Sequence, residues 1–376
     1  MMQAKGKFRV RLFLCETFRE GMRRRPWKHC SSTADRFRKR GWTEMPVELP
    51  SPEPSELEEI RLLRRSARHR YDLARVRAVY PQRVLSGWLA RGAGVRAAHP
   101  GPSDGRALPD PQVDLLLTSL AVVERHGFTF SSDHVAGAWV DNLSEEALSG
   151  AEKTAYRSLR SGIRPPRSAE LAREEGEADG AMARAFLWGY LAPGDPGFAA
   201  ELAWRDARVS HAGSGVYGAM FAAAAASAAF VCDDPLEAVL VGVGEVPDTS
   251  RLAGAVGRCV RLHLAGESWE QAVRELESAW GHLPPGHAVR TAGRVALALL
   301  YGKMALAATV ELAAAGAGER IPVAPGVAGA ILGPMLGEPG APEWPVRPGD
   351  TVAGGAGAVT VADLAGRTAR LGRHGG

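Results

Sequence analysis

His211 is the clearest candidate in this sequence for a side chain that does acid–base chemistry or holds a ligand. It ends a predicted helix, and the flexible run Gly213-Ser214-Gly215 follows it. An imidazole titrates near neutral pH, so a histidine at such a junction can act as an acid, a base or a ligand to substrate. The alternative is structural, because a histidine there can also cap the helix or lie satisfied in the core.

Two further polar clusters are typical of helix starts. Asp233-Asp234 stands directly before Pro235, and Asp248-Thr249-Ser250 follows a turn that contains Glu245. Acidic residues at a helix N-terminus suit the helix dipole, and proline is favoured at the first helical position. These clusters therefore predict capping, although Glu245 remains a candidate for a ligand-binding cleft.

A rigid loop is predicted around Pro284-Pro285, between His282 and His287. We keep His287 as a candidate ligand to substrate, beside the simpler interpretation of an ordinary loop histidine. No GxxxxGK[ST] run occurs and no sustained strand alternation is evident, which disfavours a P-loop or Rossmann nucleotide site. The four cysteines, which are Cys15, Cys30, Cys232 and Cys259, lie far apart without a CxxC pair. This spacing argues against a zinc site and against a disulfide framework, and it favours the cytoplasm.

The net charge of +4 comes from the start of the chain. Residues 1–40 hold 13 Lys or Arg against three acids, so the remaining residues carry 33 basic and 39 acidic side chains. We predict a disordered extension and linker over 1–54; a targeting peptide and an over-long start remain alternatives. The mildly acidic remainder predicts no specific nucleic-acid partner.

The least polar stretch, Val216–Cys232, is rich in alanine and is followed at once by two aspartates. It is short for a membrane span, so we predict a tightly packed buried helix and no membrane partner. Tyr217 lies at its start, directly after the glycine-containing run.

Helical spacing dominates the rest, with Gly or Pro at nearly every junction. We predict an all-α fold with a lead-in helix over 55–75 and one helical domain over 76–372. The predicted helices are 114–126, 132–142, 152–161, 179–191, 196–210, 216–231, 235–243, 249–265, 269–281, 288–301, 304–315 and 361–371.

Several stretches, taken as a linked set, resemble the ADP-ribosylglycohydrolase (crystallin J1-like) family. They include AFLWGYLAPGDP (185–196), ELAWRDARVSHAGSGVYGAMFAAA (201–224), TAGRVALALLYG (291–302) and AGAILGPMLG (328–337). The resemblance implies an all-helical fold with a two-magnesium centre in a cleft, which cuts the glycosidic bond at C1″ of ADP-ribose. In the family, a Thr-Asp-Asp run and an Asp-Thr-Asp-x-Asn run supply the metal-binding carboxylates.

This sequence departs from both runs. The early one falls on 109–112, where Asp110 matches one aspartate and Pro111 replaces its neighbour; Asp114 stands one helical step further on. The late one falls on 320–324, where Arg320 stands in place of a metal ligand and no aspartate remains. Arg320 could pair with a phosphate or carboxylate, or could simply point to solvent.

Two functions follow from the resemblance and these departures. The first is a protein with a degenerate dimagnesium site that binds an ADP-ribose-like or other ribosylated ligand without conventional hydrolysis. For this function we expect no cofactor, unless a residual Mg²⁺ site survives. Its ligand-binding candidates are His211, Tyr217, Glu245, His287 and Arg320. The second is an active hydrolase or lyase on a ribosylated molecule, with Asp110 and Asp114 as catalytic groups and Asp110 at most as a metal ligand.

Overall fold

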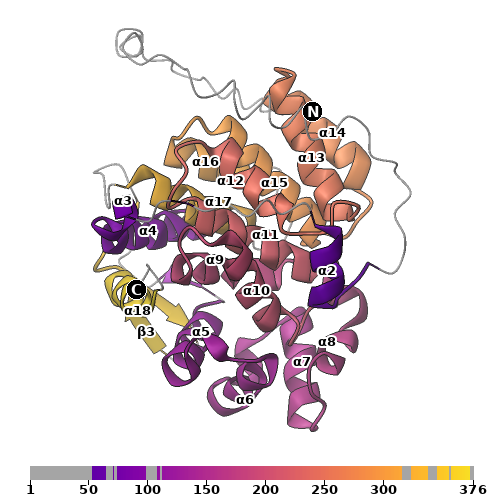
Figure 1. Cartoon of the computed structure of the whole chain (residues 1–376), viewed down its shortest axis with the longest axis vertical. Helices are drawn as coiled ribbons and strands as arrows, with labels where there is room; N and C mark the ends of the chain where they lie inside the picture. The colour runs from indigo at the N-terminus through magenta and orange to yellow at the C-terminus, as the bar shows by residue number, and fades with distance from the viewer. Residues whose placement is uncertain are drawn as a thin grey trace, which may run out of the picture. The chain divides into compact units, whose positions relative to one another are not determined.

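The computed structural model describes residues 53–64, 71, 74–98, 108–110, 112–315, 323–337, 345–354 and 357–372, and helices dominate these residues (Figure 1). The longer helices are α4 (Tyr80–Ala98), α5 (Val113–His126), α6 (Ser132–Asn142), α7 (Gly150–Arg160), α9 (Gly180–Leu191), α10 (Pro196–Ala207), α11 (Ser214–Ala228), α12 (Pro235–Gly244), α13 (Arg251–Leu264), α14 (Trp269–Trp280), α15 (Ala288–Tyr301), α16 (Leu306–Ala314), α17 (Val323–Leu336) and α18 (Val361–Leu371). Short helical turns are α2 (Leu57–Leu63), α3 (Ala74–Arg77), α8 (Arg167–Glu170), η3 (Gly127–Thr129), η4 (Glu145–Ala147) and η5 (Arg173–Glu177).

The predicted helices and the all-α fold class are confirmed, with bounds shifted by a few residues. Local capping explains this agreement. Helix α12 begins at Pro235, and the side chain of the preceding residue, Asp234, accepts a hydrogen bond from the backbone N–H of Leu236. At the start of α6, Ser131 forms a capping box with His134. Such caps satisfy backbone donors that have no partner within the helix, so short-range sequence fixes these helix starts.

The centre of the fold is α11, in which every residue is buried. It packs against α9, α10, α12 and α15. The prediction of a buried helix at Val216–Cys232 is therefore confirmed. Among the described residues, no helix is long and apolar enough to cross a membrane.

A second close packing joins α4 to α17, two helices far apart in the sequence. Their backbones approach closely where glycines replace side chains. A Cβ built on Gly329 would lie 2.2 Å from the carbonyl oxygen of Ala90, and one built on Gly94 would lie 2.1 Å from that of Pro325. Only residues without a Cβ fit at these two positions.

A small three-stranded sheet was not predicted. Its strands are β1 (Leu108–Pro109), β2 (Thr351–Gly354) and β3 (Gly357–Thr360). β1 pairs with β2 in parallel, and β2 pairs with β3 in antiparallel. Strands of two to four residues are too short for an alternating pattern to show. The sheet matters because it fixes the chain directly before Asp110.

The predicted lead-in helix over 55–75 is wrong in its extent. Helix α2 ends at Leu63, and Arg64 has extended backbone angles. Arg64 leaves the helix because its backbone bridges to Pro247 and its guanidinium pairs with Glu245. Residues 65–70, and the predicted extension except for residues 53 and 54, lie outside the described part of the chain.

Candidate functional site

Asp110, the first predicted catalytic group, forms a buried ion pair with Arg91. It follows β1 directly, and both of its carboxylate oxygens face the guanidinium of Arg91 from the middle of α4. Arg91 Nη2 lies 3.1 Å from Asp110 Oδ1, and Arg91 Nη1 pairs with Oδ2. The backbone N–H of Gln112 also donates to Oδ1, at 3.0 Å. Asp110 is 3% exposed and Arg91 is 4% exposed, so solvent screens this bidentate pair little.

Aromatic rings cover the Arg91 guanidinium. Its Cζ lies 5.1 Å from the ring centre of Phe186 and 6.0 Å from that of Trp88. These distances are typical of cation–π contacts, which add to the attraction from Asp110. The cation is thus held between a carboxylate and two rings rather than pointed toward solvent.

The other residues of the predicted metal site do not complete a cluster. Asp114 is buried in the first turn of α5. Arg320 lies outside the described residues, and the late motif re-enters the structure at Val323 and Ala324, which are apolar and begin α17. Within the described ranges, no three His, Cys, Asp or Glu side chains gather closely enough to hold a metal ion.

His211 is fully enclosed between α10 and α11. Its Nδ1 lies 2.8 Å from Ser210 Oγ, and its Nε2 accepts from the backbone N–H of Ala181 at 3.3 Å. Because Nε2 accepts, the ring proton belongs on Nδ1, where it faces the serine oxygen. Burial lowers the pKa of His211 well below its usual value, and the nearby Arg184 charge lowers it further. The imidazole is thus neutral, with both ring nitrogens engaged inside the fold.

A buried polar cluster beside His211 was missed from the sequence. Arg184 of α9 donates to Asp206 Oδ2 at 2.8 Å and to Glu152 Oε1 at 3.1 Å, and its Cζ lies 5.4 Å from the ring centre of Trp139. Burial raises the pKa of Glu152, against the opposing effect of Arg184. A single arginine inside the apolar stretch GAMARAFLWGYL was the signal available. This cluster ties α7, α9 and α10 together.

His287 belongs to a different polar network, at the starts of α13 and α15. It caps α15 by accepting from the Val289 N–H at Nδ1, and its Nε2 lies 3.2 Å from Glu177 Oε2. Glu177 also pairs with Arg251, the first residue of α13. Burial raises the pKa of Glu177, but the hydrogen bond from His287 and the charge of Arg251 outweigh burial and lower that pKa to about 2.

Residues 53–64, which we call the N-terminal strap, reach this network through Glu53. Glu53 Oε1 accepts from the backbone N–H of Arg251 at 2.8 Å, and Oε2 accepts from Ser214 Oγ at 3.0 Å. The Arg251 guanidinium lies 3.5 Å from the same carboxylate, whose side chain is 9% exposed. Glu53 therefore joins the first residues of α11 and α13.

Tyr217 contacts the strap rather than an open cleft. Its hydroxyl donates to the carbonyl oxygen of Pro54. Burial raises the pKa of Tyr217, and the charge of Glu53 adds to that rise. The next strap residue, Ser55, accepts through its carbonyl from Trp204 Nε1 at 2.9 Å.

Glu245 is engaged by the far end of the strap. It is almost fully buried and pairs with Arg64. The Leu63 carbonyl accepts from the Asp248 N–H at 3.1 Å, and Arg61 of α2 reaches Glu201 of α10 at 2.6 Å. Figure 1 shows α2 beside α10. Tyr217 and Glu245 thus share one neighbour, the strap, which sequence analysis took for part of a linker and a lead-in helix.

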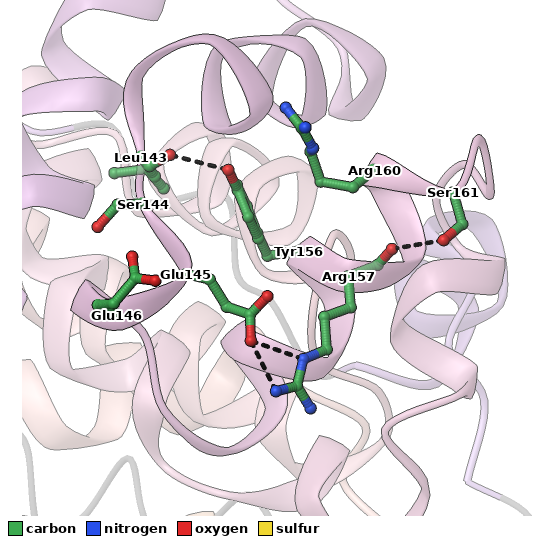
Figure 2. Close-up of a pocket in the computed structure, with 8 residues that line it drawn as sticks. All are labelled: Leu143, Ser144, Glu145, Glu146, Tyr156, Arg157, Arg160 and Ser161. Carbon is green, nitrogen blue, oxygen red and sulfur yellow. Dashed lines mark hydrogen bonds and ion pairs between the residues drawn. The ribbon is translucent and has the colours of Figure 1, made fainter.

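A surface groove of about 500 Å³ lies elsewhere, along α7 (Figure 2). Two of its charged groups pair with each other, since Arg157 donates to Glu145 Oε1 at 2.6 and 2.8 Å. None of the predicted site residues lines it. The lining residues are Leu143, Ser144, Glu145, Glu146, Tyr156, Arg157, Arg160 and Ser161.

Comparison with known families decides what this scaffold is. The family model described as ADP-ribosylglycohydrolase matches residues 54–370. This chain belongs to the ADP-ribosylglycohydrolase family. A search of curated proteins finds no match.

The match places both predicted metal motifs inside an ADP-ribosylglycohydrolase frame. Residues 54–370 include Asp110, the late-motif position 320 and most of the strap. The resemblance found in the sequence is therefore confirmed at the level of family and fold. The positions at which we expect the two family motifs, 109–112 and 320–324, both lie within the matched region.

Proposed function

We propose that this ADP-ribosylglycohydrolase family member has a degenerate dimagnesium site and binds an ADP-ribose-like or other ribosylated ligand without conventional metal-dependent hydrolysis. The observation that carries the proposal is the buried pair of Arg91 and Asp110. Both oxygens of the one aspartate that matches the early motif already hold a cation.

The donor set around Asp110 does not fit a pair of magnesium ions. Mg²⁺ takes six oxygen ligands at about 2.0–2.1 Å and binds through carboxylates. Here the carboxylate faces a guanidinium, which is a donor only and carries a charge that repels a divalent cation. Asp114 is one further carboxylate near the start of α5, and Val323 and Ala324 of the late motif offer no side-chain oxygen.

The polar network at the starts of α11, α13 and α15 supports ligand binding. It includes two of the predicted ligand-binding residues, Tyr217 and His287, and the cation Arg251. Helix N-termini and an arginine together favour the negative charge of a phosphate. A ribosylated ligand with a phosphate group therefore has a place to bind that does not involve Asp110.

Calorimetry with ADP-ribose tests the proposal, in EDTA and again in millimolar Mg²⁺. We expect the same dissociation constant in both buffers, and no release of ADP-ribose from an ADP-ribosylated protein in either. The Arg251→Met variant should bind at least tenfold more weakly, because it removes the guanidinium placed at the phosphate (about 1.4 kcal/mol per tenfold change). Binding or hydrolysis that requires Mg²⁺ would favour the active-hydrolase alternative and overturn the proposal.

A further inference from the structure

The strap already occupies the polar groups that the ligand would need. Glu53 holds Arg251 and Ser214, and the Pro54 carbonyl holds the Tyr217 hydroxyl. At the other end, Arg64 holds Glu245. Two residues predicted to bind ligand thus bind the chain's own N-terminal strap.

The groups that surround the Glu53 carboxylate form an anion-binding site. The carboxylate accepts from a backbone N–H at the first residue of α13 and from a hydroxyl at the first residue of α11, and a guanidinium lies 3.5 Å away. The positive ends of two helices and an arginine stabilise any anion of this size, whether carboxylate or phosphate. A phosphate that replaced Glu53 would leave the local charge balance almost unchanged, because one anion would leave as another arrived.

We propose that the N-terminal strap is an intramolecular competitor of the ligand. In this proposal Glu53 occupies the binding site of the ligand's phosphate, and ligand binding displaces residues 53–56. This inference rests on the proposed function. The strap lowers the apparent affinity for the ligand, because the ligand binds only the fraction of molecules in which Glu53 has left this site.

The packing of the strap suits a reversible opening. Residues 53–56 precede α2 and are held by polar contacts to six residues of the core: Trp204, Arg208, Gly213, Ser214, Tyr217 and Arg251. The buried anchor is Ile60, which is 0% exposed, whereas its neighbour Leu62 is 85% exposed. The segment at Glu53 can therefore lift away while α2 stays attached at Ile60, since a region with few buried apolar contacts opens at low cost.

The Glu53→Gln variant tests the competition, with Glu58→Gln as the matched control. Glu58 lies on the same strap but is exposed and pairs with Arg61. Titrated calorimetrically with ADP-ribose, Glu53→Gln should bind about tenfold more tightly than the wild type, and Glu58→Gln should match the wild type. Equal affinities for Glu53→Gln and the wild type would overturn the proposal.

A charge-neutral change separates competition from a simple loss of negative charge. Trp204→Phe removes the hydrogen bond to the Ser55 carbonyl and keeps a smaller aromatic ring at this position, so it should tighten ADP-ribose binding about threefold by loosening the strap. In the wild type, saturating ADP-ribose should also speed hydrogen exchange in the peptide 53–63. Unchanged exchange in that peptide at saturation contradicts displacement.

Inorganic pyrophosphate makes the failure of this inference distinguishable from failure of the proposed function. If no variant binds ADP-ribose but Glu53→Gln binds pyrophosphate more tightly than the wild type does, the proposed ligand is wrong and the competing strap is supported. If pyrophosphate binds the wild type and Glu53→Gln equally, or binds neither, the strap inference is overturned.

Discussion

At the scale of single residues, Arg91 places a positive charge of the chain itself against Asp110 inside the core. A guanidinium delivers one positive charge with fixed geometry, and here that charge is neutralised within the core. Because the cation belongs to the chain, the pair needs nothing from solution to form. Its removal should then affect stability as well as any ligand chemistry.

The variant Arg91→Met should lower the free energy of unfolding by about 3–5 kcal/mol, because it leaves the Asp110 carboxylate buried and unpaired. Adding Asp110→Asn should recover most of that loss, since the buried charge is then gone. Urea denaturation measures both effects. The control is Arg160→Met on the exposed face of α7, which should change the free energy by less than about 0.5 kcal/mol. A loss below 1 kcal/mol for Arg91→Met alone would contradict a buried, tightly coupled pair.

Glu177 should give the fold a recognisable acid dependence. Its pKa in the folded state, about 2, lies below its usual value. The stabilising contribution of Glu177 is therefore complete above about pH 5 and is lost as the pH falls toward 2; its size is about 1–3 kcal/mol. In urea denaturation at a series of pH values, Glu177→Gln should be less stable than the wild type at pH 7, and this difference should shrink as the pH falls from about 5 toward 2.

The control for this pH series is Glu174→Gln, an exposed residue of the same 3₁₀ turn. Its stability should follow that of the wild type at every pH. A gap between Glu177→Gln and the wild type that stays constant from pH 7 to pH 3 would show that the ionised carboxylate is not what stabilises the network.

The sequence predicted the candidate site only in part, and the reason is physical. Asp110 was singled out by its spacing from a recognisable helix, but its partner Arg91 lies in an arginine-rich sequence where one more arginine carries little signal. Tyr217 and His287 were singled out, whereas the contacts of Tyr217 with the strap were not. Glu53 and Arg251 are 198 positions apart, and no local pattern predicts such a pairing.

At the scale of elements, close helix packing depends on glycine. Gly329→Ala should lower the free energy of unfolding by about 1–3 kcal/mol or more, because the added Cβ meets the Ala90 carbonyl, which is backbone. The matched control is Gly137→Ala in α6, where a Cβ would meet nothing within 4 Å. That change should stabilise by about 0.5–1 kcal/mol through helix propensity. Thermal denaturation of both variants measures the change in stability. A change in the same direction for both variants would contradict this prediction.

Helix starts were predictable from sequence where caps are local, as with Ser131 and Asp234. The strap and the small sheet were not predictable from sequence, because tertiary contacts hold them in place. The Pro-, Glu- and Ser-rich segment before α2 has the composition of a linker, yet residues 53–56 pack against α10, α11 and α13. Strand β1 is two residues long and is stabilised by pairing with β2, far away in the chain.

At the scale of the whole molecule, buried apolar packing between helices holds the family scaffold together. The central helix α11 is buried throughout, and α4 and α17 pack backbone to backbone. Burial of apolar surface in such contacts is the dominant stabilising contribution to a fold of this size. Substitution at the motif positions can thus change function while the helical frame persists.

We propose that the site around Asp110 holds a protein cation instead of metal ions. Electron paramagnetic resonance of Mn²⁺, a substitute for Mg²⁺ with the same preference for oxygen ligands, tests it most directly when the wild type and Asp110→Asn are titrated side by side. We expect the Mn²⁺ signal to stay that of the free ion with both proteins at up to millimolar concentration. Two manganese ions bound per chain in the micromolar range, and lost in Asp110→Asn, would contradict the account.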